Sequence, residues 1–379
     1  MGVFRVLQVF TVMNRGGAES MIMNYYRKLD KSRIQFDFLV HRKNRGAFDD
    51  EIEEMGGNIY RFDAINPLFP NKYYKELRAF LNQHNEYRII HSHLNTFSCF
   101  PLKIAEEFGI PCRIAHAHIA IDKVNIFSLF KSKESKSETI KKIIKLQLKK
   151  RIKNHATHFL SCGQKAGEWL FDNSPFTTMN NAIDTESFLY DKTIEAAYKE
   201  KLGLCDELVL GHIGRFVSQK NHEFLLKIFE EVLNKKENVS LVLIGDGPLR
   251  SNIEQAAKKM KVDHKIQFLG VRPDIPKLCQ MLHFFVFPSF YEGLPVTLIE
   301  AQASGLKILA SDTITKEVEL TSNIKFLSIQ DSPRFWADQI LNSKGYEKQN
   351  TKEAIVKGGY DIISNTRKIE EFYLKQISK

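Results

Sequence analysis

Short apolar runs alternate with amphipathic segments along the whole chain. In the first half, we expect strands at Arg5–Phe10, Phe36–Val40, Ile59–Phe62, Arg88–His93, Arg113–Ala117 and His158–Cys162. Between them, apolar residues recur at helical spacing in Ala18–Leu29, Tyr73–Gln83 and Phe97–Phe108. Strands rich in Val, Ile, Leu and Phe are typical of a parallel sheet that helices cover on both faces.

The same alternation begins again after residue 200. The expected strands there are Leu208–Ile213, Ser240–Ile244, Ile266–Leu269, Phe284–Phe287, Lys307–Ala310 and Ile324–Leu327. The expected helices include Asn221–Leu233, Leu249–Met260 and Val296–Ser304, and the tail Ile369–Ile377 is also helical in pattern. Two such series predict an α/β protein with two doubly wound, Rossmann-like domains.

A polar, turn-forming stretch at Asn180–Asp184 separates the two series. We therefore expect a first domain at residues 1–181 and a second at 182–359. Residues 360–379 are expected to form a C-terminal helix that packs back on the first domain. At 379 residues the chain is long enough for two domains of ordinary size.

Composition fits a globular protein and indicates its compartment. Hydrophobic residues make up 43% of the chain and charged residues 26%. No apolar run reaches the roughly 18 residues that a membrane-spanning helix needs. The five cysteines are widely spaced without a Cys-x-x-Cys pair, and the N-terminus has no signal-peptide pattern. We therefore expect a cytoplasmic protein.

Positive charge is concentrated in one segment. The chain carries +10 overall, and residues 131–153 hold ten Lys or Arg against two glutamates. Apolar residues recur at helical spacing there, at Ile140, Ile143, Ile144, Leu148 and Ile152. Lysines lie largely on the opposite side, at Lys142, Lys145, Lys149 and Lys153. Such a helix either lies on an anionic membrane surface or packs on the core with a solvated cationic face. Nucleic-acid binding is a further alternative, but the segment lacks interleaved aromatic residues.

The most informative motif spans residues 290–301. Glu292 precedes Gly293-Leu294-Pro295, and Glu300 follows eight residues after Glu292. Pro295 fits the first helical position, because its missing N–H would have no partner there. A helix N-terminus presents free N–H groups and a partial positive charge, which suit a phosphate. One carboxylate near a phosphate and another about two turns away suit a nucleotide sugar, although two incidental glutamates on a buried helix give the same spacing.

Two cations follow the first expected strand of the second domain. Arg215 comes directly after Gly214, and Lys220 lies where the next helix begins. An arginine holds a diphosphate with two N–H groups and a lysine acts as a point charge, so the pair predicts a diphosphate site. Two solvated surface cations are the alternative. Ser218 or Asn221 is expected to cap the helix.

Glycines suggest two further turns. Gly245-Asp246-Gly247-Pro248 follows a strand and is interpreted as a mainly structural turn that could line a cleft. In the first domain, Gly16 and Gly17 stand between the first strand and a helix, which would let the backbone approach an anion. A plain tight turn explains such a pair equally simply, because neither a Gly-x-Gly-x-x-Gly pattern nor a P-loop lysine accompanies it.

Two His-x-His pairs end adjacent expected strands. They are His91 with His93 and His116 with His118. Alternation along a strand places both members of each pair on one face. No carboxylate or cysteine pattern accompanies them, and Asp-x-Asp is absent from the chain. We therefore interpret one or two of them as ligands of hydroxyl groups and the rest as satisfied polar groups, rather than as a metal site.

Taken in order, these motifs resemble the large family 4 of retaining glycosyltransferases, whose GT-B fold has two Rossmann-like domains facing a cleft. The match runs from Gly16-Gly17-Ala18-Glu19 through the inter-domain Asn181–Thr185 to Glu300. It is stronger in the second half and is closest in character to bacterial enzymes of capsular and exopolysaccharide synthesis. Gln302 and Ser304 depart from the small or sulfur-containing residues that are usual there.

The resemblance implies a set of site residues. Around the donor it places Gly16, Gly17, Arg215, Lys220, Glu292, Gly293, Leu294, Pro295 and Glu300. Arg215 and Lys220 would hold the diphosphate and offset the charge of the leaving group. Glu300 would bind the ribose, and Glu292 would accept hydrogen bonds from the donor sugar. His116 would face that sugar, so the implied catalytic residues are His116, Glu292, Arg215 and Lys220.

The implied activity is that of a hexosyltransferase. It would move a hexose or N-acetylhexosamine from a UDP-sugar to a glycan or a polyprenyl-diphosphate-linked saccharide. Such enzymes need no metal and no other cofactor. A nucleotide-sugar epimerase on the same fold is the alternative enzyme class. Through residues 131–153 the protein would lie at the inner face of the cell membrane as a peripheral protein.

Overall fold

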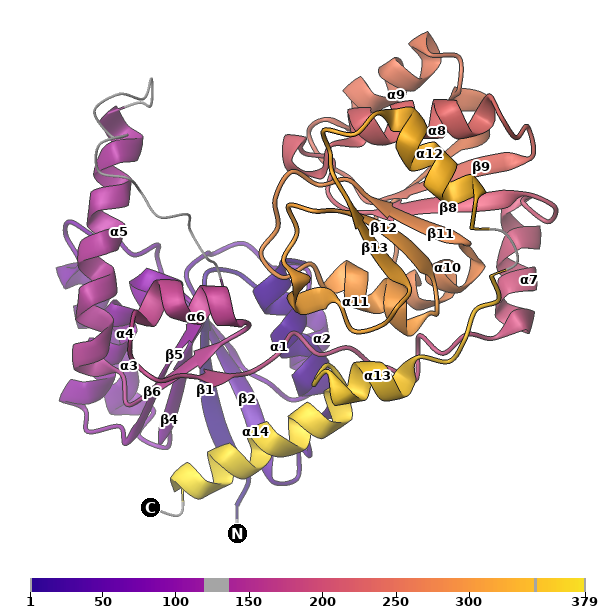
Figure 1. Cartoon of the computed structure of the whole chain (residues 1–379). Coiled ribbons are helices and arrows are strands. Elements are labelled where there is room, and N and C mark those ends of the chain that lie inside the picture. The colour runs from indigo at the N-terminus through magenta and orange to yellow at the C-terminus, as the bar shows by residue number, and fades with distance from the viewer. Residues whose placement is uncertain (1, 119–135, 344–345, 378–379) are drawn as a thin grey trace. The chain divides into compact units, whose positions relative to one another are not determined.

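The chain forms two compact units, which Figure 1 shows in a computed structural model. The structure describes residues 2–118, 136–343 and 346–377. Unit 1 comprises Met1–Ala182 and Ile362–Lys379, and unit 2 comprises Ile183–Asp361. The chain thus passes into unit 2 within the polar stretch around residue 182 and returns to unit 1 with its last helix.

Each unit contains one sheet. The strands of unit 1 are β1 (Phe4–Phe10), β2 (Ile34–Val40), β3 (Ile59–Arg61), β4 (Ile89–Ser92), β5 (Cys112–Ala117), β6 (His158–Ser161) and β7 (Thr177–Thr178). Those of unit 2 are β8 (Leu208–Ile213), β9 (Val239–Ile244), β10 (Ile266–Gly270), β11 (Phe284–Phe287), β12 (Lys307–Ser311) and β13 (Ile324–Leu327). Every strand that the apolar runs predict is present, and only the short β7 is added.

Helices connect the strands. In unit 1 they are α1 (Gly17–Lys28), α2 (Asp49–Glu54), α3 (Asn71–Gln83), α4 (Cys99–Glu107), α5 (Lys136–His155), α6 (Gln164–Phe171) and α14 (Ile362–Ile377), with the 3-10 turn η1 (Asn95–Ser98). In unit 2 they are α7 (Lys192–Leu202), α8 (His222–Leu233), α9 (Arg250–Lys259), α10 (Ile275–Met281), α11 (Val296–Ala303), α12 (Pro333–Leu341) and α13 (Lys352–Lys357), with the 3-10 turns η3 (Ser218–Lys220), η4 (Asp263–Lys265) and η5 (Lys316–Val318).

Both sheets are parallel and share one topology. The strand order is β3-β2-β1-β4-β5-β6-β7 in unit 1 and β10-β9-β8-β11-β12-β13 in unit 2. The order reverses between β1 and β4 in unit 1 and between β8 and β11 in unit 2. Open α/β sheets bind ligands at such a switch point, beyond the carboxyl ends of the strands. The predicted pair of doubly wound, Rossmann-like domains is confirmed.

The strands of unit 2 show why apolar runs predict this architecture. In β11, Phe284 and Val286 join the apolar cluster on one face of the sheet, and Phe285 and Phe287 join the cluster on the other. Because both faces are covered by helices, neither set of alternating side chains can be polar. The strand therefore appears in the sequence as an unbroken apolar run.

The last helix completes the core of unit 1. In Figure 1, α14 lies along the side of the unit 1 sheet that carries β1 and β2. Its Tyr373 is fully buried and packs edge-on against Phe36 of β2, with ring centroids 6.0 Å apart. The final residues of the chain therefore contribute to a core whose other members come from its first half.

The basic helix α5 is partly packed on unit 1. Leu148 and Ile152 are buried in the core, and Lys149 forms an ion pair of 2.6 Å with Asp172. Lys145 and Lys150 are exposed, so this part of the helix largely agrees with the core-packed alternative, but Leu146 is 37% exposed and the side chain of Lys149 is mostly buried. Three side chains of the predicted faces lie outside the described residues: Ile140, Lys142 and Ile143.

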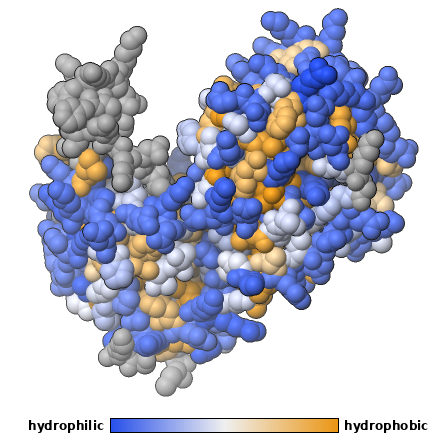
Figure 2. Space-filling model, viewed as in Figure 1, coloured by the Kyte–Doolittle hydropathy of each residue, from blue (hydrophilic) through white to orange (hydrophobic). Residues whose placement is uncertain are grey.

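The surface agrees with the composition. Figure 2 shows a largely hydrophilic visible face with separate, smaller hydrophobic areas. Within the described ranges, no helix combines the length and the apolar character needed to cross a bilayer.

Candidate functional site

The predicted site residues of unit 2 gather at the switch point between β8 and β11. Lys220, after β8, donates from Nζ to Oε1 of Glu292, after β11, across 2.7 Å. Both side chains are mostly buried, and the Lys220 ammonium lies 4.7 Å from the centre of the Phe287 ring. These two residues are 72 positions apart, so the sheet topology brings them together.

Further hydrogen bonds tie the two loops to each other. Gln219 donates from its side chain to the carbonyl oxygen of Tyr291 at 2.8 Å, and its own carbonyl accepts from the N–H of Phe290 at 2.9 Å. Asn221 donates to the carbonyl oxygen of Pro288 at 3.2 Å. Asn221 is the N-cap residue of α8, as one of the two expected caps, but its side chain bonds across to the other loop and not to the helix.

The Gly245-Gly247 turn supports the loop that carries Arg215. A Cβ on Gly245 would lie 2.1 Å from the carbonyl oxygen of Gly214, and one on Gly247 would lie 2.6 Å from that of Phe216. Gly245 also has a positive φ of 131°, which favours glycine. The N–H of Phe216 bonds to the carbonyl oxygen of Asp246 at 3.0 Å. The interpretation of this turn as mainly structural is confirmed.

Arg215 and Glu300 are the predicted residues of unit 2 whose charges are uncompensated. Arg215 is exposed, and no hydrogen bond or ion pair holds its guanidinium within the described parts of the chain. Glu300 is half-buried on α11 and likewise has no side-chain partner there. Burial raises the pKa of Glu300 to about 7. A carboxylate with a perturbed pKa and no protein partner is a candidate ligand-binding group.

The start of α11 differs by one residue from the expected start. Pro295 is the residue before the helix, with an extended backbone (φ −76°, ψ 95°), so its predicted place as the first helical residue is wrong and Val296 takes that place. The N–H groups of Gly293 and Leu294 have no hydrogen-bond partner among the residues described. Gly293 is exposed, and a Cβ there would meet no atom within 4 Å. The predicted donor groups in front of α11 are thus free.

The Gly16-Gly17 turn lies at the switch point of unit 1. Gly16 precedes α1 and bonds to the carbonyl oxygen of Asn14 at 2.9 Å, and Gly17 is the first residue of the helix. A Cβ built on Gly17 would meet no atom within 4 Å, and its φ is not in the left-handed region. Packing and backbone conformation therefore do not explain this glycine.

The four strand-end histidines form one stack in unit 1. The rings of His91 and His93 lie 4.2 Å apart, as do those of His116 and His118. His91 Nε2 lies 3.0 Å from His116 Nδ1, and His93 Nδ1 lies 2.8 Å from His118 Nε2. As alternation predicts, each pair shares a face of the sheet. The buried His116 Nε2 has no partner among the described residues.

Three of these rings come close enough for a metal ion to be considered. One nitrogen from each of His91, His93 and His116 lies within 4.8 Å of the others. However, His91 uses Nδ1 for Tyr373 and Nε2 for His116, and both nitrogens of His93 are also hydrogen-bonded to side chains. A metal would have to displace these bonds, so the arrangement fits a hydrogen-bond network better than a metal centre.

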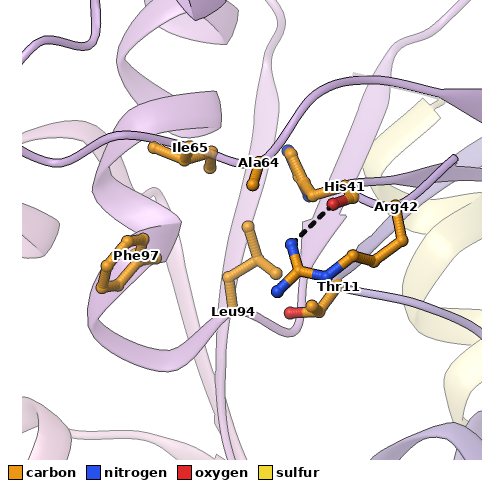
Figure 3. Close-up of a pocket in the computed structure, with 7 residues that line it drawn as sticks. All are labelled: Thr11, His41, Arg42, Ala64, Ile65, Leu94 and Phe97. Carbon is orange, nitrogen blue, oxygen red and sulfur yellow. Dashed lines mark hydrogen bonds between the residues drawn. The ribbon is translucent and has the colours of Figure 1, made fainter.

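A hollow of about 360 Å³ lies beyond the carboxyl ends of β1 to β4, as Figure 3 shows. Apolar side chains of Ile65, Leu94 and Phe97 face it, and Arg42 lies on the side away from Phe97. Arg42 donates to the carbonyl oxygen of His41 at 2.8 Å. The His41 Nε2 is buried and has no partner within the described ranges. An apolar hollow with a cation and an unpaired polar group is a typical small-molecule site.

Several residues of these sites were not predicted. Gln219 could not be predicted, because nothing in its local sequence indicates that it bonds to the loop after β11. Arg42 and His41 directly follow β2, so their place at the end of a parallel strand was the available signal. Tyr373 lies on a helix whose apolar pattern indicates only burial.

Comparisons with known proteins agree with this architecture. Residues 207–343 match the family model described as "Glycosyl transferases group 1". EpsF of Bacillus subtilis, which is named as a glycosyltransferase, is 34% identical over 97% of this chain and 96% of its own length. CapH of Staphylococcus aureus, a capsular polysaccharide biosynthesis glycosyltransferase, is 24% identical over 99% of both chains.

A relative and a solved structure extend the comparison. An Escherichia coli enzyme named UDP-Gal:alpha-D-GlcNAc-diphosphoundecaprenol alpha-1,3-galactosyltransferase is 24% identical over 90% of both chains. Anabaena HepE, crystallised with UDP, shares the fold with a TM-score of 0.76 at 15% identity, over 98% of this chain and 100% of its own. A further HepE structure contains UDP-glucose and has a TM-score of 0.75.

The fold and the full-length relatives together define a glycosyltransferase of GT-B architecture. Its two parallel, Rossmann-like sheets are the fold that the chain shares with HepE. The chain belongs to the group 1 glycosyltransferase family. None of the relatives described above is an epimerase or a nucleic-acid-binding protein.

Proposed function

We propose that this glycosyltransferase is a retaining enzyme of family 4 that moves a hexose or N-acetylhexosamine from a UDP-sugar to a glycan or lipid-linked saccharide. The observation that carries the proposal is the Lys220–Glu292 pair at the unit 2 switch point, in front of α11. A cation and free N–H groups suit a diphosphate, and carboxylates suit the hydroxyls on either side of it. Relatives named for capsular polysaccharide synthesis support the same pathway class.

UDP is the proposed nucleotide. Crystals of HepE with UDP and with UDP-glucose support a uridine donor in this fold. In this chain, Glu300 is the proposed partner of the ribose hydroxyls, because its carboxylate is half-buried and has no protein partner in the described residues. Glu292 is proposed to accept hydrogen bonds from the sugar while Lys220 balances its charge.

The proposed transfer separates charge, which the unit 2 site is suited to stabilise. The bond between the anomeric carbon and the diphosphate breaks, and its electron pair stays on the UDP oxygen. The acceptor hydroxyl oxygen bonds to the same face of the anomeric carbon, and its proton goes to the departing phosphate. Arg215, Lys220 and the N–H groups before α11 would stabilise the developing negative charge.

The remaining proposed contacts come from unit 1. Gly17 would let the donor phosphate approach the start of α1, because that glycine has open space around it. His116 is proposed to bond to the donor sugar through Nε2, the buried nitrogen that lacks a partner among the described residues. Neither role needs a metal ion, and we propose that the enzyme works without one.

We propose that the hollow of unit 1 receives the acceptor. Sugar faces pack well on apolar side chains such as Phe97, and Arg42 suits a phosphate next to the sugar. Leu68 and Phe69, three and four residues beyond Ile65, are 64% and 75% exposed. This exposed apolar pair suits a polyprenyl chain, and the Escherichia coli relative named for a diphosphoundecaprenol-linked acceptor supports that class.

The proposed location is the cytoplasmic side of the cell membrane, where a polyprenyl-linked acceptor would be available. Exposed cations on α5, such as Lys145 and Lys150, would add attraction to an anionic lipid surface.

The proposal is tested by measuring release of UDP from a set of UDP-sugars with and without polyprenyl-diphosphate-linked saccharides. We expect release that depends on the acceptor, a product in which the anomeric configuration is retained, and unchanged activity in a chelator. Calorimetry with UDP and GDP gives an independent measurement of donor binding. Binding of GDP but not UDP contradicts the donor assignment, and inversion of configuration contradicts the mechanism.

A further inference from the structure

Six side chains of unit 1 form one continuous line of hydrogen bonds, here named the histidine chain. Its members in bonding order are His118, His93, Gln8, Tyr373, His91 and His116. The separations along it are 2.8, 2.9, 3.4, 2.7 and 3.0 Å. The line starts at His118 after β5 and continues through residues after β4, in β1 and in α14. It then returns through His91 in β4 to His116 in β5.

The four rings of the histidine chain are neutral. Burial lowers the pKa of His91, His93 and His116 well below the ordinary value, and it lowers the pKa of His118 to about 3. A neutral imidazole carries one proton, on Nδ1 or on Nε2, so each ring has one donor and one acceptor. The direction in which the chain donates therefore decides where every proton lies.

The Gln8 amide sets this direction. Its Nε2 faces the Tyr373 oxygen, and its Oε1 faces His93 Nε2. Because the amide nitrogen only donates, the hydroxyl proton of Tyr373 goes to its other partner, His91 Nδ1, at 2.7 Å. His91 then carries its own proton on Nε2, which donates to His116 Nδ1 at 3.0 Å.

The direction of donation along the histidine chain determines the tautomer of its last ring, His116. His116 Nδ1 accepts a hydrogen bond, so the His116 proton lies on Nε2. This atom is buried and has no partner in the described part of the molecule. Buried polar groups without a partner are rare, and one at the end of an otherwise satisfied chain indicates the place of a ligand atom. That ligand atom has to be a hydrogen-bond acceptor.

We propose that Tyr373 and His91 are positioning residues that hold His116 in the Nε2–H form, so that it donates a hydrogen bond to a hydroxyl oxygen of the donor sugar. This inference rests on the proposed function and adds the direction of the hydrogen bond, with His116 as the donor and the sugar hydroxyl as the acceptor. In this form His116 is a donor at Nε2 and cannot take the acceptor's proton there. The departing diphosphate remains as the destination of that proton.

Nitrogen-15 NMR of the full-length protein labelled at histidine tests the assignment directly, because protonated and bare ring nitrogens differ widely in chemical shift. The variant His116→Gln identifies the His116 signals by their loss. We expect the proton of His116 on Nε2 in the unmodified protein. A proton on Nδ1 overturns the proposal.

Two substitutions change the polarity in different ways. In Gln8→Glu at about pH 8, the carboxylate accepts from both neighbours, so Tyr373 accepts from His91 and the proton of His116 moves to Nδ1. In Tyr373→Phe the chain is interrupted, and we expect both forms of His116. An unchanged Nε2–H form in both variants overturns the positioning role.

Enzyme kinetics provides a second readout. We expect kcat to fall at least about tenfold in Gln8→Glu and by less in Tyr373→Phe, with an unchanged KM for the UDP-sugar, since a wrong tautomer impairs catalysis without moving the ring. The matched control is Tyr26→Phe, which removes hydroxyl bonds to the carbonyl oxygens of Phe36 and Met55 in the same core. A similar fall of kcat in Tyr26→Phe contradicts the proposal, because the loss would then result from a general destabilisation of unit 1.

The two kinds of measurement separate this inference from the proposed function. If no sugar is transferred under any condition, the proposed function fails while NMR still decides the tautomer. If transfer occurs with His116 protonated on Nδ1, the function stands and the positioning role is overturned.

Discussion

The two switch points use the same topology for different chemistry. In unit 2, the charged Lys220 and Glu292 face each other, and Arg215 and Glu300 lack compensating charges among the described residues. In unit 1, the switch point holds neutral imidazoles that bond to one another and to Tyr373 and Gln8, and the cation Arg42 lies after the neighbouring strand β2. The proposed function gives this difference a reason: the leaving diphosphate needs charge, whereas a sugar needs neutral hydrogen-bond partners of fixed direction.

Removing the cation of unit 2 should have the largest effect. Lys220→Met leaves the mostly buried Glu292 without its partner and removes charge beside the proposed diphosphate. We expect kcat to fall by about 10²- to 10³-fold, as for the loss of one group that stabilises a transition-state anion. The control Lys235→Met breaks a more exposed ion pair with Asp338 in the same unit and should keep its activity. Equal kcat values for the two variants contradict the charged role of Lys220.

His116→Ala tests the neutral site of unit 1. Because its ring is proposed to touch the sugar and not the nucleotide, kcat should fall by about 10²-fold, as for the loss of one hydrogen-bond donor to the transition state, while UDP affinity stays unchanged. The measurement pairs steady-state kinetics with UDP calorimetry. His84→Ala, at the end of α3, is the control. A loss of thermal stability with full turnover per folded molecule would indicate a packing role instead.

Glu300→Gln should weaken UDP binding by about 10- to 100-fold, as for a lost hydrogen bond to a charged group. Because the pKa of Glu300 is about 7, the carboxylate forms as the pH rises through neutrality, and UDP affinity should rise with it. UDP itself titrates near this range, so the decisive quantity is the difference between the two proteins across pH 6 to 8. A constant difference contradicts the role of the ionised carboxylate.

The same residue gives a stability test. Burial raises the folded pKa of Glu300 from 4.5 to about 7, so between these values the folded protein holds a proton that the unfolded chain releases. Its contribution to stability is therefore fully present below pH 4.5 and is lost as the pH rises to about 7. Glu300→Gln should remove this part of the pH dependence of the melting temperature.

Arg42→Gln should raise the KM for a diphosphate-linked acceptor by about tenfold and leave UDP affinity unchanged. Arg45→Gln is the control, because Arg45 lies nearby in sequence but pairs with Asp50 and Glu53. For an acceptor without phosphate, Arg42→Gln and the unmodified protein should have the same KM. A raised KM for that acceptor would indicate that Arg42 maintains the shape of the hollow and does not bind the phosphate.

The smallest effect is expected for the basic helix. Lys145→Gln should weaken binding to anionic vesicles about fivefold in a sedimentation assay, and added salt should also weaken it, since each surface lysine adds about 1 kcal/mol. Lys149→Gln is the informative comparison, because Lys149 is engaged with Asp172. Recovery of the unmodified protein in the supernatant, with or without vesicles, contradicts membrane contact.

The two units also differ in how much of them could be predicted from sequence. Glu292, Lys220 and Arg215 follow strands whose apolar runs are unmistakable, and charged residues directly after a buried strand attract attention. The ion pair between Lys220 and Glu292 joins residues 72 positions apart. Both residues lie in loops at the ends of adjacent strands, so the sheet topology brings them together. The predicted start of α11 at Pro295 was wrong by one residue, because a proline fits just before a helix as well as in its first position.

The histidine chain shows what sequence could not provide. The strand-end positions predict that His91 and His116 share an edge of the sheet. Their polarity, however, depends on Gln8 and Tyr373, whose side chains bond across 365 positions. No local period links a strand at the start of a chain to a helix at its end. Tyr373 has the pattern of an ordinary core residue, and only the fold shows that its hydroxyl has a directional role.

The return of α14 to unit 1 inverts the order in which the molecule can be completed on the ribosome. Domains usually fold in the order of synthesis. Here unit 2 is one continuous segment that is synthesised completely before Tyr373, whereas unit 1 begins first and is complete only with the last helix. Until α14 has been made, the first unit lacks the helix that covers one face of its core. A premature stop codon just before α14 would therefore spare the nucleotide half and leave its companion unfinished.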